Sequence, residues 1–266
     1  MTLKALVRKI FRYYMPAGIA YIVIFSNFPR CMIRLILDKS DSRKILYLRK
    51  KLSKGSKIGF QVDSLLHAGH FSAVYFRQEY RALSVEGKTV IDVGAANGDT
   101  AIYFYLRGAT QIIAVESNVK SYLSLCNNVS LNKLGNRIKT LNCAVGRTKG
   151  TIRVDPDVPP SPGNSPKEHE GGIPIDIITL EDLIENISNP MALKLDCEGC
   201  EFDAILGSSL KVLSRFDEIF MEFHGNPFDI AKRLQEAGFR TEYEVGKTIG
   251  YLHARNKNPD ISNMSL

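Results

Sequence analysis

Residues 90–104 constrain the fold of this chain more than any other stretch. They read Val-Ile-Asp-Val-Gly-Ala-Ala-Asn-Gly-Asp-Thr-Ala-Ile-Tyr-Phe: a short apolar run with one acid, a loop with two glycines, and a second apolar run. This pattern predicts a buried strand, a tight loop and the start of a helix. In α/β proteins a ligand binds where such a loop leaves the carboxyl end of a strand. We therefore expect a nucleotide-like ligand at Gly94 and Gly98, because glycine lets the backbone approach a ligand closely.

Strand-like and helix-like patterns alternate along the rest of the chain. Alternation of this kind predicts an α/β fold with a Rossmann-like, mostly parallel seven-stranded sheet and helices on both faces. The seven predicted strands cover residues 89–93, 111–115, 138–143, 191–195, 216–223, 239–245 and 248–254.

The composition divides the chain into a large domain with attachments at both ends. Residues 1–55 form a basic, hydrophobic N-terminal segment, residues 56–258 form the α/β domain, and residues 259–266 form a tail. An insertion at 155–172 interrupts the domain and contains five of the eleven prolines. Insertions of this length are usually functional lids or disordered loops, so we expect a lid or a substrate wall here.

The positive charge of the chain is concentrated at its N-terminus. Residues 1–60 carry 14 Lys and Arg against two acids, whereas the remainder carries 21 against 26. Residues 13–29 contain no charge and have basic residues on both sides. Two interpretations stay open: a hydrophobic helical segment docked on the domain, or a membrane anchor or interfacial helix. The second predicts membrane contact through residues 1–35 and a cytoplasmic protein attached to the cytoplasmic face.

The five cysteines are odd in number and irregularly spaced, which argues against a disulfide framework and favours a reducing compartment. Cys197 and Cys200 are separated by two residues, as in zinc and redox motifs. No second pair accompanies them, so we interpret both as small apolar packing residues.

The glycine loop argues against a dinucleotide cofactor. The G-x-G-x-x-G fingerprint would need glycine at Ala96 and Asp99. The pattern from Asp92 to Gly98 instead resembles motif I of class I S-adenosylmethionine methyltransferases. Glu116 ends the next predicted strand, 22 residues after Gly94, where a carboxylate can accept hydrogen bonds from both ribose hydroxyls.

Three later segments resemble the FkbM family of methyltransferases: Asp-Ile-Ile-Thr-Leu-Glu-Asp-Leu at 176–183, Lys-Leu-Asp-Cys-Glu-Gly-Cys-Glu at 194–201, and Met-Glu-Phe-His at 221–224. The similarity covers roughly residues 60–255. It implies that S-adenosyl-L-methionine is the cofactor and that a hydroxyl of a sugar, glycolipid or similar metabolite is methylated. The resemblance does not fix the acceptor. The cofactor-binding residues that it implies are Asp92, Gly94, Ala95, Gly98, Glu116, Ser117, Asn142 and Ala144.

Four side chains are predicted at the carboxyl ends of neighbouring strands: Asp196, Glu198, Glu222 and His224. A hydroxyl is a poor nucleophile, so a base within reach helps methyl transfer. We expect His224 or Asp196 to be this base, with Glu222 orienting or balancing charge and Glu198 binding acceptor hydroxyls. Glu201 is interpreted as structural.

Other functions remain as alternatives. The acids and the histidine are also able to hold a divalent cation, but no separate ligand motif is present and no metal is predicted. A nucleic-acid methyltransferase is disfavoured because acids near the methyl group would repel phosphates, so no nucleic-acid partner is expected. A non-catalytic subunit that binds S-adenosylmethionine is the remaining alternative.

Overall fold

The computed structural model describes residues 22, 24–27, 44–62, 71–155, 169–188 and 190–258. The chain forms two compact units, one of residues 1–80 with 127–134 and the other of residues 81–126 with 135–266. Most of the uncharged stretch 13–29, the centre of the insertion and the tail 259–266 lie outside the described residues. Within the described ranges, no helix has the length and apolar character needed to cross a bilayer. The domain boundary at residue 55 stays a prediction.

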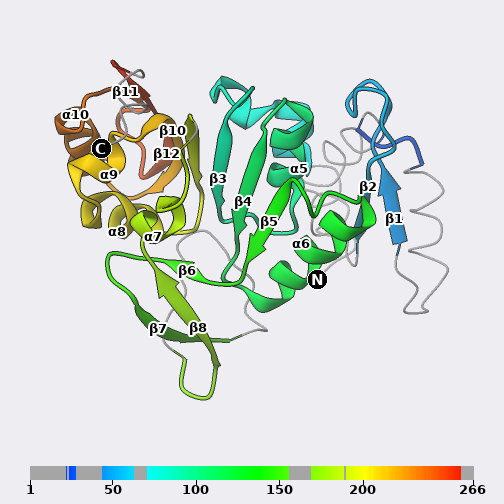
Figure 1. Ribbon diagram of the computed structural model, residues 1–266, viewed down its shortest axis with the longest axis horizontal. Helices are drawn as coiled ribbons and strands as arrows, with labels where there is room; N and C mark the ends of the chain where they lie inside the picture. The colour runs from blue at the N-terminus through cyan, green and yellow to red at the C-terminus, as the bar shows by residue number, and fades with distance from the viewer. Residues whose placement is uncertain are drawn as a thin grey trace, which may run out of the picture. The chain divides into compact units, whose positions relative to one another are not determined.

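The second unit is built on a seven-stranded sheet with the order β11-β12-β10-β9-β3-β4-β5 (Figure 1). Strands β5, β4, β3, β9 and β10 pair in parallel, whereas β12 runs antiparallel to both of its neighbours. The predicted Rossmann-like fold and its mostly parallel sheet are therefore confirmed. The strands are β3 (Thr89–Val93), β4 (Gln111–Val115), β5 (Ile138–Leu141), β9 (Met191–Leu195), β10 (Phe216–His224), β11 (Phe239–Tyr243) and β12 (Ile249–Asn256).

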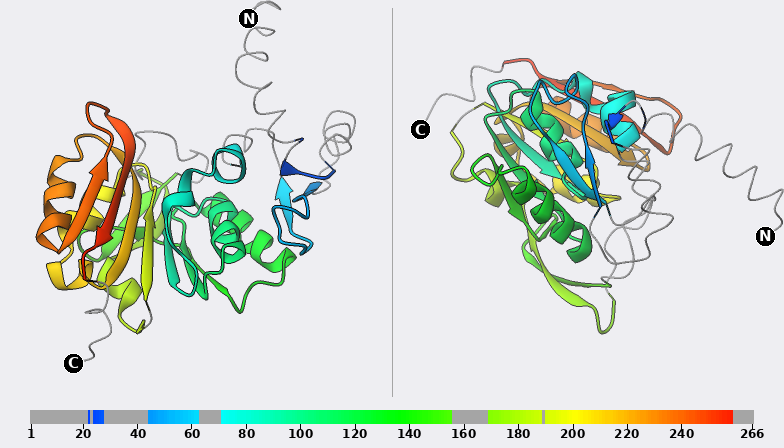
Figure 2. Two further views of the ribbon diagram at one scale, coloured as in Figure 1. Left: turned by 90° about the horizontal axis from the view of Figure 1, so that it is seen from above. Right: turned by 90° about the vertical axis from the view of Figure 1, so that its right-hand side faces the viewer.

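The strand order reverses at β3. From β3 the chain proceeds to β4 and β5 on one side, and later to β9 and β10 on the other. Because crossovers between parallel strands are right-handed, the helices of the two halves must cover opposite faces. Figure 2 shows α8 and α10 on one side of the strands and α5 on the other. The helices are α5 (Asp99–Leu106), α6 (Val119–Leu131), α7 (Leu180–Ile184), α8 (Cys200–Gly207), α9 (Leu210–Leu213) and α10 (Phe228–Glu236).

The central strands β3 and β9 are buried along their whole length. Sheets covered on both faces need apolar side chains on both, which explains the continuous apolar runs in the sequence. Each run contains one charged residue, and these two, Asp92 and Lys194, are register partners on adjacent strands. The core thus contains one polar pair directly beneath the carboxyl ends of the strands.

A separate three-stranded sheet lies beside the insertion. It has the order β6-β8-β7, formed by β6 (Ala144–Val145), β8 (Ile173–Ile178) and β7 (Gly150–Val154). The insertion connects β7 to β8, and residues 156–168 within it lie outside the described residues. A capping box begins α7: Thr179 and Asp182 each accept a hydrogen bond from the other's backbone amide.

The first unit contains the hairpin of β1 (Lys44–Tyr47) and β2 (Gly59–Val62), with η3 (Ser72–Arg77) and η4 (Glu79–Ala82) following in the chain. Phe25 is buried in an edge-to-face cluster with Phe60 and Phe71, and its backbone forms a bridge with Leu48. Of the predicted helical N-terminal segment, the described residues 22 and 24 are helical, whereas residues 25–27 form a bridge and a turn against the end of β1, so the helix does not continue there.

Candidate functional site

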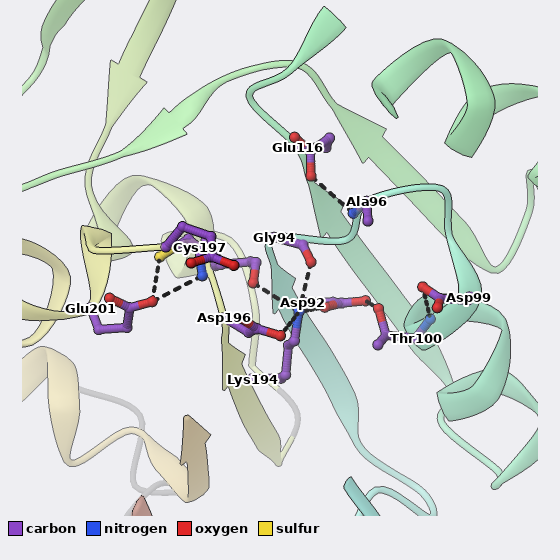
Figure 3. A network of polar contacts seen from close by, with 12 residues as sticks. Asp92, Gly94, Ala96, Asp99, Thr100, Glu116, Lys194, Asp196, Cys197 and Glu201 are labelled. Carbon is purple, nitrogen blue, oxygen red and sulfur yellow. Dashed lines mark hydrogen bonds and ion pairs between the residues drawn. The ribbon is translucent and has the colours of Figure 1, made fainter. Parts of the chain in front are cut away.

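The first part of the site is a set of contacts around a buried lysine, which we call the Lys194 cluster: Asp92, Thr100, Lys194 and Asp196 (Figure 3). Strand register places Lys194 opposite Asp92, and the Nζ–Oδ1 distance is 3.2 Å. The other Asp92 oxygen accepts a 2.6 Å hydrogen bond from the Thr100 hydroxyl. Since both members of the ion pair are at most 1% exposed, each charge depends on the other for compensation.

Lys194 also fixes the start of the glycine loop. Its Nζ donates hydrogen bonds to the carbonyls of Val93 at 3.2 Å and Gly94 at 2.7 Å. Burial alone would lower the pKa of Lys194, but the carboxylates of Asp92 and Asp196 outweigh burial and raise it. The ammonium is therefore charged and ties the ends of β3 and β9 together.

Gly94 and Gly98 meet different steric demands. Gly94 has φ of +78°, and a Cβ there would lie 1.8 Å from the carbonyl oxygen of Asp196. Gly98 has φ of +87° and precedes α5, where a Cβ would lie 2.8 Å from the Leu125 side chain. Only glycine fits the first position, because the obstacle is backbone rather than a movable side chain.

Glu116 follows β4 and faces the glycine loop. One of its carboxylate oxygens accepts a hydrogen bond from the Ala96 amide at 2.9 Å, and the other accepts from the Asn118 amide at 2.7 Å. The side chain is 4% exposed, and burial raises the pKa of Glu116 despite the two amide donors. The carboxylate is thus held in a fixed orientation, with lone pairs left for further donors.

The remaining predicted cofactor residues surround Glu116 and the loop. The Asn142 side chain donates to the carbonyls of Glu116 at 2.8 Å and Ser117 at 3.3 Å, which joins the segments after β4 and β5. Ala95 is fully buried and its amide donates to Val115. Ala144 lies in β6, paired with Ile177.

Two backbone amides at the start of α5 are already bonded to nearby side chains. The Asp99 amide donates to the Asn97 side chain, and the Thr100 amide donates to the Asp99 side chain. Pyrophosphate groups bind helix N-termini through free amides and are repelled by acids. These contacts therefore agree with the argument against a dinucleotide.

The second part of the site is the His224 cluster: Glu198, Glu201, Glu222 and His224. His224 ends β10, with its Nε2 3.1 Å from Glu198 Oε2 and its Nδ1 3.5 Å from Glu201 Oε1. Glu198 lies in the turn before α8, and Glu201 lies in the first turn of that helix and is fully buried. The imidazole is therefore placed between two carboxylates.

This environment changes the protonation of His224. The contact with Glu201 is the largest cause that raises its pKa, burial opposes it, and the charges of Glu201, Glu198 and Glu222 add to the increase. The result is a pKa of about 9, compared with 6.5 for an ordinary histidine. At neutral pH the imidazole is a cation with both nitrogens protonated, so it lacks the free lone pair that a base needs.

Asp196, a member of the Lys194 cluster, directly follows β9. Its amide donates to the Val93 carbonyl, and its carboxylate is 4.0 Å from Lys194 with 23% of the side chain exposed. Met221 is the register partner of Leu195, so Glu222 and Asp196 follow paired residues at the ends of adjacent parallel strands. The three predicted catalytic side chains and the predicted acceptor-binding Glu198 thus belong to one edge of the sheet.

Sequence reasoning missed several residues of this site. The sequence feature that could have identified Lys194 is its position as a charged residue within an otherwise apolar strand. A charged residue that is buried in this way must have a partner of opposite charge. Glu201, interpreted as structural, is a direct neighbour of His224. For Thr100 the sequence offers no signal that it binds Asp92.

The interpretation of Cys197 and Cys200 as small apolar packing residues is confirmed in that both pack against the hydrophobic core, but it did not include the bond between them. They are joined by a disulfide across the turn into α8, and they contact the hydrophobic core as a bonded pair. Within the ranges that the structure describes, Cys126 and Cys143 are free.

The strand order, the glycine loop and the acid after β4 together define a class I methyltransferase fold. A family model, the methyltransferase FkbM domain, matches residues 92–241. The chain belongs to the FkbM family of methyltransferases, whose methyl donor is S-adenosylmethionine.

Individual relatives are more distant. Protein arginine N-methyltransferase 6 of Xenopus tropicalis is 38% identical over 72 residues, which is 27% of this chain and 21% of that protein. The match thus spans about a fifth of that relative's length. Its Xenopus laevis counterpart is 36% identical over the same number of residues and the same shares of both chains.

The solved structures that match this chain have low sequence identities and low TM-scores. The precorrin-6y C5,15-methyltransferase of Geobacter metallireducens is 10% identical with a TM-score of 0.41, covering 65% of this chain and 82% of that one. TrmK of M. capricolum, solved with S-adenosylhomocysteine, is 13% identical with a TM-score of 0.41, covering 69% and 68%.

The residues at the glycine loop fit S-adenosylmethionine. The Glu116 carboxylate is oriented by two amides and retains acceptor capacity for ribose hydroxyls. The acids Glu116 and Asp196 suit a sulfonium, which is positively charged, and Lys194 is turned inward onto Asp92 and the loop carbonyls. The negative charges of these carboxylates therefore complement the positive charge of S-adenosylmethionine.

Proposed function

We propose that this protein transfers a methyl group from S-adenosylmethionine to a hydroxyl of a sugar, glycolipid or similar metabolite. The observation that carries the proposal is the row of carboxylates at the carboxyl ends of β9 and β10, next to the glycine loop. Carboxylates accept hydrogen bonds from hydroxyls and repel phosphodiesters, which favours a hydroxylated acceptor over a nucleic acid.

In this proposal Asp196 is the base. The cofactor supplies an electrophilic methyl group on a sulfonium centre. The Asp196 amide donates a hydrogen bond to the carbonyl of Val93, the residue before Gly94, and the Asp196 carboxylate is partly exposed. His224 is less suited to the role because its raised pKa keeps it protonated. Lys194 lies 4.0 Å from the Asp196 carboxylate and helps to position it.

The His224 cluster binds the acceptor. The imidazolium holds the Glu198 carboxylate at 3.1 Å, so Glu198 is oriented to accept a hydroxyl hydrogen. Glu222 contributes negative charge that balances the imidazolium. Binding and base functions are thereby assigned to different carboxylates.

The cofactor part of the proposal is tested by calorimetry of the purified protein with S-adenosylmethionine, S-adenosylhomocysteine and NAD. We expect the first two to bind and Glu116→Gln to weaken them about 10- to 100-fold, because a charge-assisted hydrogen bond contributes roughly 1.5–3 kcal/mol. Binding of NAD alone would overturn the proposal.

The acceptor is tested with methyl-labelled cofactor against free sugars, lipid-linked saccharides, an RNA and an arginine-rich peptide. The proposal expects an alkali-stable methyl ether on a hydroxylated acceptor, and labelling of only the RNA or the peptide would contradict it. Asp196→Asn should lower turnover roughly 100- to 10,000-fold while leaving S-adenosylhomocysteine binding nearly unchanged. If Asp196→Asn retains full rate, Asp196 is not the base.

A further inference from the structure

The disulfide between Cys197 and Cys200 lies inside the candidate active site. It joins two residues whose Cα atoms are 5.5 Å apart and closes the turn that leads from β9 into α8. Glu198 and Gly199 are the two residues enclosed by this bond. The bond therefore constrains an acceptor-binding residue directly.

The enclosed backbone is in an unusual conformation. Glu198 has φ of +59° and Gly199 has φ of +123°. A glutamate in the left-handed region is strained and persists only where its surroundings hold it there. The disulfide is a covalent part of those surroundings, and it keeps the Glu198 carboxylate near His224.

The same turn contacts both clusters (Figure 3). The Cys197 amide donates to Glu201 Oε1 at 3.0 Å, and Glu201 in turn lies beside His224. On the other side, the Asp196 carbonyl lies against Gly94 so closely that no side chain fits between them. A conformational change in this turn would therefore move Asp196 and Glu198 and would disturb the glycine loop at Gly94.

The two residues are also less buried than the free cysteine Cys143. Both cysteines are partly exposed, whereas Cys143 is buried and burial raises the pKa of its thiol to about 11. Thiol–disulfide exchange requires a thiolate to reach a sulfur, so the pair is reactive where Cys143 is inert.

We propose that Cys197 and Cys200 form a reversible thiol–disulfide site, reduced by a dithiol, that sets the position of Glu198 against His224. A thiolate of the dithiol attacks one sulfur, the protein S–S bond breaks, and the other cysteine leaves as a thiolate. The second thiol then attacks the mixed disulfide. The protein gains two electrons and two protons, and the dithiol is oxidised to a disulfide.

Reduction releases the constraint on Glu198. Three carboxylates face His224: Glu198 from the turn, Glu201 from α8 and Glu222 from β10. When the turn relaxes, Glu198 moves away while Glu201 and Glu222 stay on regular elements. The pKa of His224 should then fall from about 9 toward the ordinary value.

The test uses the full chain, purified without reductant and then treated with dithiothreitol. Mass spectrometry after alkylation should show two cysteines that become reactive together under conditions that leave the fold intact. NMR titration of His224, assigned with His224→Gln, should give a lower pKa after reduction and in the double variant C197S/C200S. The matched control Cys126→Ser should respond to reduction as the wild type does.

Cooperative urea unfolding of the reduced protein and of C197S/C200S shows that both are folded. The proposal is overturned if the His224 pKa is equal in both redox states, or if the bond is reduced only on unfolding. It is also overturned if the protein purified without reductant has no disulfide and a disulfide reagent fails to form one. None of these measurements depends on the acceptor, so they are independent of the proposed reaction.

Discussion

The Lys194 cluster and the His224 cluster lie at the ends of neighbouring strands, yet they hold their charges differently. Lys194 is buried with Asp92 and two backbone carbonyls, and neither charged side chain exceeds 1% exposure. His224 faces three carboxylates, with Glu198 19% exposed, and Glu201 Oε2 makes no hydrogen bond to the described residues. In the first arrangement the charges neutralise each other, and Lys194 holds the start of the glycine loop in place. The second retains excess negative charge and a carboxylate oxygen, Glu201 Oε2, without a hydrogen bond to the described residues.

The largest effect on stability is expected when Lys194 is replaced in the Lys194 cluster. Lys194→Met leaves Asp92 buried without its cation, and breaking such a pair costs roughly 3–5 kcal/mol of folding free energy. Urea unfolding measures the loss. The matched control is Lys88→Met, because Lys88 pairs with Asp217 and Glu218 in partly exposed contacts and should cost less. Equal losses in the two variants would remove the distinction that we draw.

The His224 cluster predicts a pH dependence of stability. The folded pKa of His224 is raised from 6.5 to about 9, so its contribution is complete below pH 6.5 and disappears as pH rises through 9. The full contribution is about 3 kcal/mol at most, at about 1.4 kcal/mol per pKa unit. Unfolding of wild type and His224→Gln at pH 6, 7.5 and 9.5 should show a difference that shrinks with pH. A constant difference would mean that His224 is neutral in the folded protein.

The close approach of Gly94 to Asp196 predicts a smaller effect on cofactor binding. Gly94→Ala forces the Asp196 carbonyl to move and should weaken S-adenosylhomocysteine about 10- to 100-fold, measured by calorimetry. Gly87→Ala is the matched control, since Gly87 has φ of +74° but a Cβ at that position would meet nothing within 4 Å. If both variants bind equally well, the contact between loop and turn is unimportant for the cofactor.

The smallest effects are expected on the pKa of His224 when each acid around it is replaced in turn. Replacing each by glutamine should lower the His224 pKa most for Glu201, less for Glu198 and least for Glu222, following the order of their contributions. NMR titration distinguishes the three. Glu218→Gln removes the acid beside the other buried histidine, His253, and should leave His224 unchanged. A different ranking would show that the partner of His224 is misassigned.

The main sheet was predictable because its strands are apolar runs between amphipathic helices. The predicted ranges for β3, β4 and β9 coincide with the structure, since burial on both faces leaves an unbroken apolar signal. The strand Ile173–Ile178 was not predicted, because Pro174 and a mostly exposed pattern hide it. Lys44–Tyr47 was hidden in the same way by its basic surroundings.

The candidate site was predictable in its residues more than in its contacts. Acids and a histidine at strand ends meet because parallel strands share an edge, which needs only the order of the elements. The pairing of Lys194 with Asp92 depends on register between strands about 100 residues apart. The charge of His224 depends on Glu201 turning inward, and the disulfide depends on the shape of a turn. These are tertiary facts that no local pattern encodes.

The position of β12 also orders the assembly of this sheet during synthesis. Among the strands that the structure describes, β11 pairs only with β12, and β12 is made after it. Until residue 256 has left the ribosome, β11 lacks this partner and β10 presents an open edge. The strands that carry the cofactor loop, β3 and β4, are complete more than 130 residues earlier in the sequence than the end of β12. Strands β3 and β4 can therefore pair with each other long before β10 gains β12, whereas β3 gains its other partner only when β9 has been made.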